Sequence, residues 1–145
     1  MWMRTSLVTA GAAVLMLGAG APLVAHHAFS AEFDSTRPVT LKGKVTKMEW
    51  INPHAWLHMD VRTPDGKVVS WAVEGGAPNA LLRRGWNRTS VPPGTEIVVE
   101  GYRAKDGSNR ANGRDVTLAN GTKLFLGSSG TGAPADGRDA AEPKK

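Results

Sequence analysis

The chain has 145 residues, a formal net charge of +5 and no cysteine. This length fits one small domain, and the absence of cysteine excludes disulfide bonds, thiolate zinc sites and catalysis by a nucleophilic thiol. The positive charge favours an anionic partner, although a cluster of basic residues such as Arg83, Arg84 and Arg88 is more often a solvated face.

Residues 1–25 have the pattern of a cleavable export signal. Arg4 gives the first residues a positive charge, residues 7–17 are apolar, and Ala25 is a small residue ahead of His26. We therefore expect a periplasmic or secreted protein that begins at His26, keeps no stable membrane span and does not meet nucleic acid. The alternative is an uncleaved membrane anchor, because the apolar stretch approaches the roughly 18 to 20 residues that a span needs.

Residues 26–38 form an N-terminal segment without sustained periodicity, in which two phenylalanines are expected to dock a short turn against the domain. A first strand is predicted over residues 39–50. The phase of its apolar side chains changes near Thr46 or Lys47. Such a change indicates a bulge, which lets a strand bend.

Turn signals at residues 52–53 and 64–66 bound the next two strands, which are predicted over residues 55–62 and 67–74. Apolar and polar side chains alternate in the first of them, and successive side chains on a strand point to opposite faces. The apolar set is expected to face the core: Ala55, Leu57, Met59 and Val61. The polar set is expected to face outward: His54, Trp56, His58 and Asp60.

The remaining elements are a helix over residues 78–84, a strand over 95–105, a polar loop over 106–113, a strand over 114–118, a short strand over 123–126 and a disordered tail over 127–145. Three strands, a helix and two strands are the element order of an OB-like five-stranded barrel, here over residues 39–126, with the helix between strands three and four. The predicted class is thus all-β with one short helix. An open sandwich or roll with the same hairpins is the alternative.

OB-type barrels bind ligands across their second and third strands, between the loops that follow strands one and four. Trp56 faces outward there as an aromatic platform, and the flanking loops supply amide and basic side chains. The candidate ligand-binding residues are Trp56, Asn52, Asp60, Lys105, Arg110 and Arg114. They predict a small anionic or sugar-like ligand, or an envelope protein partner. Alternatively, Trp56 is a surface residue covered by the N-terminal segment or by the helix.

The candidate metal ligands are the four histidines, His26, His27, His54 and His58. The free amine and imidazole of His26, with the imidazole of His27, would form a nitrogen set suited to copper, and binding would weaken as the pH falls through the histidine range. On a straight strand His54 and His58 lie roughly 13 Å apart, too far to share an ion unless the turn at Pro53 folds His54 inward. Alternatively, His54 hydrogen-bonds within the turn and His58 is a surface residue.

Catalysis has little support in the sequence. The spacing of Asp60, Asp65 and Glu74 pairs no two carboxylates, and the glycines match no phosphate-loop or dinucleotide fingerprint. The sequence therefore favours a non-catalytic binding protein, with an enzyme of unknown reaction as a further alternative.

Several motifs resemble a family of small exported bacterial proteins of unknown function. They are His26-His27-Ala28-Phe29, Phe33-Asp34, the strand at residues 41–45, the Glu-Trp-x-Asn-Pro-His turn at residues 49–54, and residues 83–86 and 101–107. The resemblance covers nearly all of the chain after residue 25. It implies export and a single β-rich domain, and it assigns no catalytic or binding residue.

Overall fold

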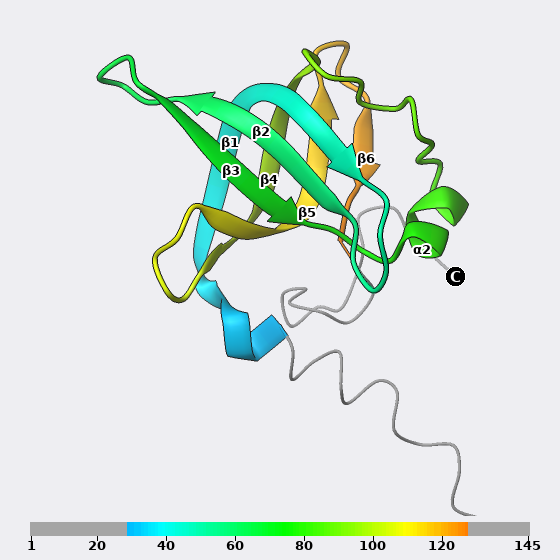
Figure 1. The fold of residues 1–145 in the computed structure, drawn as a ribbon, viewed down its shortest axis with the longest axis horizontal. Helices are drawn as coiled ribbons and strands as arrows, with labels where there is room; N and C mark the ends of the chain where they lie inside the picture. Colours follow the sequence, from blue (N-terminus) through cyan, green and yellow to red (C-terminus); the bar gives the residue numbers. More distant parts are fainter. Residues whose placement is uncertain (1–28, 128–145) are drawn as a thin grey trace, which may run out of the picture.

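The computed structural model describes residues 29–127, which form a six-stranded sheet with two short helices (Figure 1). The strands are β1 (Phe33–Glu49), β2 (Trp56–Arg62), β3 (Val68–Glu74), β4 (Glu96–Ala104), β5 (Arg110–Leu118) and β6 (Lys123–Phe125). The helix α2 (Pro78–Arg83) lies between β3 and β4, and a helical turn at residues 29–32 precedes β1. The predicted β class is confirmed, with a helix after the third strand.

The predicted export signal at residues 1–25, His26 and His27, and all of the predicted tail after Gly127 lie outside the described residues. Gly127 itself, predicted as the first residue of that tail, is buried, and its carbonyl oxygen accepts a hydrogen bond from Arg84 Nη1 (2.6 Å). Within residues 29–127, no helix is both long enough and apolar enough to cross a membrane.

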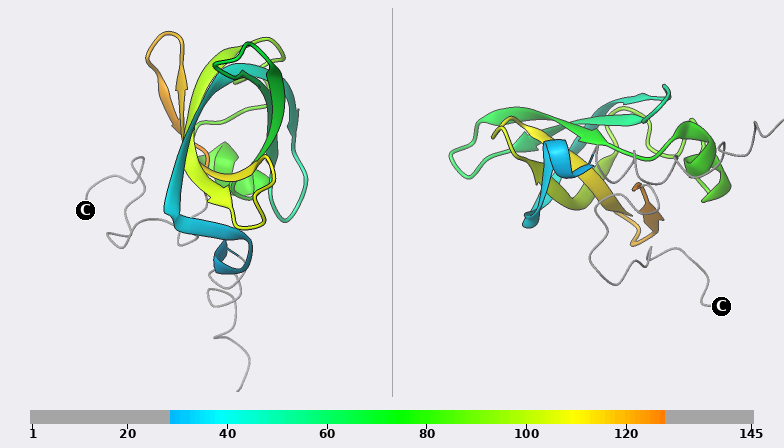
Figure 2. Two further views of the ribbon diagram at one scale, coloured as in Figure 1. Left: turned by 90° about the vertical axis from the view of Figure 1, so that its left-hand side faces the viewer. Right: turned by 90° about the horizontal axis from the view of Figure 1, so that it is seen from below.

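The first five strands close into a ring. In the order β3-β2-β1-β4-β5, neighbouring strands pair antiparallel, and β3 also pairs with β5 in parallel through residues 72–74 and 110–112. The left view of Figure 2 shows the strands as a closed loop. β6 continues the sheet beyond β5.

The ring depends on the bending of β1. This strand has 17 residues, of which the first part pairs with β4 and the second with β2. Gly43 pairs with both Val61 of β2 and Ile97 of β4. The register with β2 then shifts between Val45 and Lys47, which confirms the bulge predicted there. A glycine at a point of close approach and a neighbouring bulge let the strand turn a corner of the ring.

The core lies inside the ring and is built from alternating side chains. Leu57 and Met59 of β2 have no exposed surface, as their alternation with polar residues predicted. Near α2 the core is completed by Trp86, which is 2% exposed and whose indole Nε1 donates a hydrogen bond to the carbonyl oxygen of Phe125 (2.8 Å). The hydrogen bond satisfies the one polar group that the buried indole carries.

β1 begins at Phe33 rather than at the predicted residue 39, because its first part pairs with β4. The helical turn before it packs through a small cluster of buried side chains, in which Phe29 and Phe33 meet Ala104, with Tyr102 alongside. The rings of Phe29 and Tyr102 meet edge to face, with centroids 5.9 Å apart. The expectation that the phenylalanines dock a short turn is confirmed.

β5 begins at Arg110, not at the predicted residue 114. The prediction of a polar loop at residues 110–113 was wrong. Residues 111–113 pair with β4 on one side, and residues 110–112 pair with β3 on the other. Their polar side chains gave no alternating pattern, yet they form the seam that closes the ring.

We expect Gly43→Ala to destabilise the domain. A Cβ atom at this position would lie 2.0 Å from the backbone carbonyl oxygen of Asp60, so a strand must move to admit it. Overpacking of this kind costs about 1 to 3 kcal/mol in free energy of unfolding, which urea denaturation measures. The exposed neighbour provides the control, since Lys42→Ala should change stability by no more than about 0.5 kcal/mol. Equal stability of the two variants would contradict this role of Gly43.

Candidate functional site

The candidate site is the outer face of β2, β3 and β5. The strand register places Trp56 beside Glu74 and His58 beside Ala72 across β2 and β3. It then places Ala72 beside Arg110 and Glu74 beside Asn112 across β3 and β5. The three strands therefore bring six side chains onto one side of the sheet, which we call the outer face although Asn112 is buried there: Trp56, His58, Ala72, Glu74, Arg110 and Asn112.

Arg110 is held by groups from three parts of the chain. Its guanidinium carbon lies 5.6 Å from the centroid of the Trp56 ring and 5.8 Å from that of Phe33. The same guanidinium forms an ion pair with the carboxylate of Glu32, in the helical turn before β1. Arginine suits this position, because its planar cation stacks on aromatic rings while its edge donates hydrogen bonds to a carboxylate.

Glu74 is the most buried carboxylate of this face, with 14% of its side chain exposed. Burial raises the pKa of Glu74, and the negative charge of Glu32 raises it further. His54, Arg110 and a hydrogen bond from Asn112 act in the opposite direction. A proton on Glu74 is therefore sensitive to any change in the Glu32–Arg110 pair.

His54 and His58 have different partners. His54 Nδ1 donates a hydrogen bond to the carbonyl oxygen of Gly75 (3.1 Å) and lies 3.6 Å from Glu74 Oε1. His58 Nε2 lies 2.9 Å from Glu49 Oε2. Hydrogen bonds from Lys47 and His58 lower the pKa of Glu49. In the part of the chain that the structure describes, no three or more His, Asp or Glu side chains are grouped so that they could hold a metal ion.

A hollow of about 440 Å³ lies next to His58 on this side of the ring. It is bordered by Thr46, Lys47, His58, Ser70, Trp71, Ala72 and Asn109. The small side chain of Ala72 leaves space, and the hydroxyl, amide, imidazole and ammonium groups around it can donate or accept hydrogen bonds. Most of its exposed lining is nevertheless apolar, and a mixture of apolar surface with a few polar groups suits the ring of a sugar.

The structure brings together only some of the predicted site residues. Trp56, Arg110 and His54 share the neighbourhood of Glu74. Lys105 instead donates a hydrogen bond to the carbonyl oxygen of Ser30. The others lie apart from this group: Asn52 is exposed in the β1–β2 loop, Asp60 accepts a hydrogen bond from Ser70 Oγ (2.7 Å), and Arg114 Nε lies 3.5 Å from Asp115 Oδ2.

Glu32 and Glu74 were not predicted as members of the ligand site. Glu74 had a usable signal, because a hairpin with its turn at residues 64–66 places it opposite Trp56. Asn112 was expected among the amide side chains of the flanking loop, and the structure places it in β5 beside Glu74 instead. Glu32 had no signal, since it precedes β1 in a segment without periodicity.

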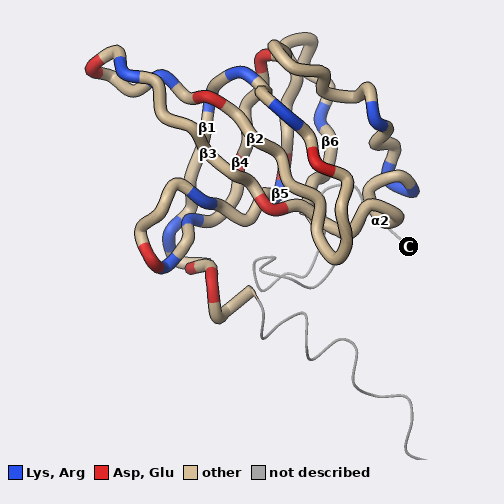
Figure 3. The backbone as a smooth tube through the Cα atoms, in the orientation of Figure 1, with Lys and Arg blue, Asp and Glu red and all other residues tan. Residues whose placement is uncertain are grey.

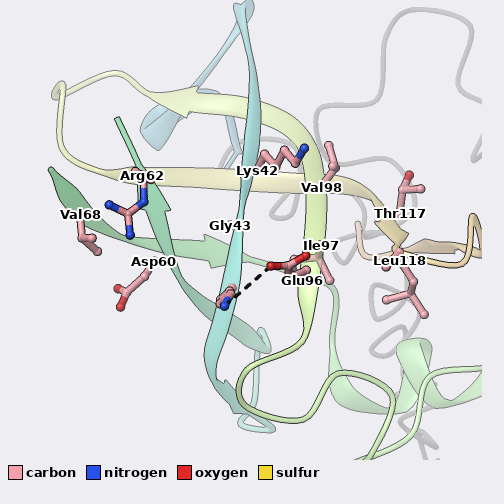
Figure 4. Close-up of a pocket in the computed structure, with 12 residues that line it drawn as sticks. Lys42, Gly43, Asp60, Arg62, Val68, Glu96, Ile97, Val98, Thr117 and Leu118 are labelled. Carbon is pink, nitrogen blue, oxygen red and sulfur yellow. Dashed lines mark ion pairs between the residues drawn. The ribbon is translucent and has the colours of Figure 1, made fainter. Parts of the chain in front are cut away.

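A larger hollow, of about 840 Å³, lies over β1 around Gly43 (Figure 4). Its border carries charges of both signs, in keeping with the mixed charges along β1 and β2 in Figure 3. Lys44 and Glu96 pair across it (3.7 Å), and Asp60 is bonded to Ser70. Its basic side chains slightly outnumber its two carboxylates, but no aromatic ring borders it. The outer face is the better candidate because there the guanidinium of Arg110 lies against the ring of Trp56.

Comparisons with known proteins give one match. The model of a family of unknown function (DUF6152) matches residues 13–113. No curated protein and no solved structure matches the chain.

We expect the pKa of Glu74 to lie above its ordinary value of 4.5 and to respond oppositely to two substitutions. Glu32→Gln removes a negative charge and should lower it, whereas Arg110→Gln removes a positive charge and should raise it. A ¹³C NMR titration of the side-chain carboxyl measures all three values. Shifts in the same direction would contradict the geometry of this cluster.

The raised pKa also predicts a pH dependence of stability. Because native Glu74 keeps its proton to a higher pH than the unfolded chain, wild-type stability should fall as the pH rises from 4.5 through the native pKa. Glu74→Gln lacks this loss. The difference in free energy of unfolding, variant minus wild type, should therefore increase between about pH 3.5 and pH 7. Urea denaturation at both values tests this. Exposed Glu96→Gln is the control and should show no such gain.

Proposed function

Since the chain belongs to a family of unknown function (DUF6152), we propose its function from its geometry: it is an exported binding domain whose outer face takes an acidic glycan. The observation that carries the proposal is the guanidinium of Arg110, 5.6 Å from the ring of Trp56, on the outer face, which also borders the hollow through His58 and Ala72. Arginine binds the carboxylate of an acidic sugar, and an aromatic ring packs against a sugar ring.

We propose that the ring is an OB-like barrel. Its strand order, its closure by the parallel β3–β5 pairing and the position of α2 between β3 and β4 support this assignment. OB-type barrels bind ligands across strands two and three, which are β2 and β3 here. Fold alone does not give function, so the ligand class rests on the side chains of the outer face.

The Glu32–Arg110 ion pair supports an anionic ligand in particular. The carboxylate of Glu32 comes from outside the ring and already occupies one edge of the Arg110 guanidinium. A ligand carboxylate would take the same place, because both present two oxygens to the same donors. About half of the Glu32 side chain is exposed, so the exchange needs no unfolding of the ring.

The proposal places the protein in the periplasm and involves no chemical step. The export pattern of residues 1–25 supports the location. On this side of the ring Glu49 is paired with Lys47 and His58, and Glu32 with Arg110. Glu74 has a raised pKa but does not border the hollow, so binding without a chemical step is the simpler proposal.

We expect tetragalacturonate, an acidic tetrasaccharide, to bind in isothermal titration calorimetry. Arg110→Gln and Trp56→Ala should each weaken binding by roughly ten-fold, the value of a charged hydrogen bond or a stacked ring. Glu32→Gln should strengthen it, because it removes the internal competitor. Arg62→Gln, on the β2–β3 hairpin, is the matched control and should have no effect.

Two results would contradict the glycan proposal. One is unchanged affinity in both Arg110→Gln and Trp56→Ala. The other is binding of hexaglutamate, but not of the oligosaccharide, through the same two residues. The second result would assign the face to an acidic segment of an envelope protein instead.

Copper binding by His26 and His27 is a second candidate function. The observation that favours it is the docking of the helical turn, where Phe29 packs on Tyr102 and Glu32 pairs with Arg110. Only Ala28 separates His27 from this packed turn. A terminus processed before His26 would supply an amine and two imidazoles, which is a donor set suited to Cu(II).

We expect Cu(II) to bind the processed protein more tightly at pH 7.5 than at about pH 5.5, because protons compete for imidazole and amine. Intact mass first establishes that His26 is the terminus. Isothermal titration should then show loss of binding in a double variant with His26→Ala and His27→Ala. His58→Ala is the control, since His58 pairs with Glu49. Undiminished affinity in the double variant would remove the copper proposal.

A further inference from the structure

The end of the ring that carries α2 has a basic surface. The segment between Glu74 and Glu96 contains three arginines, Arg83, Arg84 and Arg88, and no carboxylate. Arg83 and Arg88 are exposed. Figure 3 shows basic residues along α2 and the connection that follows it, with no acidic residue among them. Within this segment the charges of Arg83 and Arg88 are not offset by any carboxylate, so it attracts anions.

Two large aliphatic side chains are exposed at the same end. Leu82 of α2 is 50% exposed, whereas its neighbour Leu81 is fully buried and anchors the helix. Ile51, in the loop between β1 and β2, is 51% exposed. Figures 1 and 2 show this loop beside α2 in every view.

Interactions on both sides of α2 fix the loop against it. Ahead of the helix, the amide of Ala55 donates a hydrogen bond to the carbonyl oxygen of Gly76 (3.0 Å). After the helix, the guanidinium of Arg88 lies 5.9 Å from the ring of Trp50, which is half-buried. Ile51 and Leu82 therefore lie on two segments that are fixed to one another, with Arg83 next to Leu82 and Arg88 against Trp50.

We propose that this end of the domain docks on an anionic lipid surface, with Ile51 and Leu82 entering the headgroup layer and Arg83 and Arg88 contacting phosphates. Aliphatic groups surrounded by arginines and a partly buried tryptophan are typical of interfacial contacts. The charge of the surface requires an anionic partner. A stable protein interface needs roughly 800 Å² on each partner, whereas single side chains suffice to enter a bilayer surface.

The surface is separate from the Arg110–Trp56 site, so the inference does not depend on the glycan proposal. Each arginine near an anionic bilayer raises the partition coefficient by about five-fold, and this contribution is screened by salt. Docking should therefore be reversible and salt-sensitive.

The test is sedimentation of the exported protein with phosphatidylcholine vesicles that contain either none or about 30% phosphatidylglycerol. We expect binding to the anionic vesicles that falls at least ten-fold between about 0.05 and 0.5 M salt. Leu82→Ser and Ile51→Ser should each lower the partition coefficient several-fold. Arg83→Gln with Arg88→Gln should lower it by about twenty-five-fold, and should lower its salt dependence.

Matched controls come from the β2–β3 hairpin, where Val68 is 56% exposed and Arg62 is also exposed. Val68→Ser and Arg62→Gln should leave vesicle binding unchanged. All variants share the same N-terminus, so any lipid contact of the first residues cancels in the comparison. Circular dichroism verifies that each exposed-site variant is folded.

Three results would overturn the proposal. They are absence of preference for the anionic vesicles, equal effects of the α2-end variants and the hairpin variants, and binding of polyglutamate with no binding of vesicles. The last result would assign the basic surface to an acidic protein.

Discussion

The rest of the structure depends on the double pairing of β1. Around Gly43 this strand is hydrogen-bonded to β2 on one edge and to β4 on the other. A side chain at that position would collide with the backbone of β2, and the bulge just after Val45 changes the direction of the strand. The bend of β1 carries the sheet round towards the meeting of β3 with β5, and a second register shift, between Glu100 and Gly101 of β4, lies next to that seam. Ring closure therefore depends on backbone shape at its corners.

Ring closure in turn assembles the outer face. The parallel β3–β5 pairing brings Arg110 and Asn112 beside strands that lie far from them in sequence. Arg110 then meets Trp56 from β2 and Glu32 from the turn before β1, and Glu74 is enclosed between groups of opposite charge. The proton on Glu74, the Glu32–Arg110 pair and an incoming anion are thus coupled through Coulomb interactions in a partly desolvated site.

The sequence was informative where structure is local. Alternation in residues 55–62 predicted the buried and outer faces of β2, and turn chemistry predicted the hairpin and α2. It failed where pairing is long-range, at the start of β1 and at residues 110–113, whose polar side chains resemble a loop. The same distinction holds for the site. Trp56 was predicted from the alternation of β2 and Arg110 from its position in a flanking loop, whereas Glu32 reaches the site through the docked turn and was not predictable.

The most direct test of the account is a ¹H–¹⁵N NMR titration of the protein with tetragalacturonate, in which indole and guanidinium signals report on individual side chains. The account expects the largest shifts at the Trp56 indole and Arg110 Nε, with smaller ones at the amides of His58 and Asn109 beside the hollow. Shifts confined to the hollow around Gly43, or no shift at Trp56 and Arg110 at saturating ligand, would contradict it.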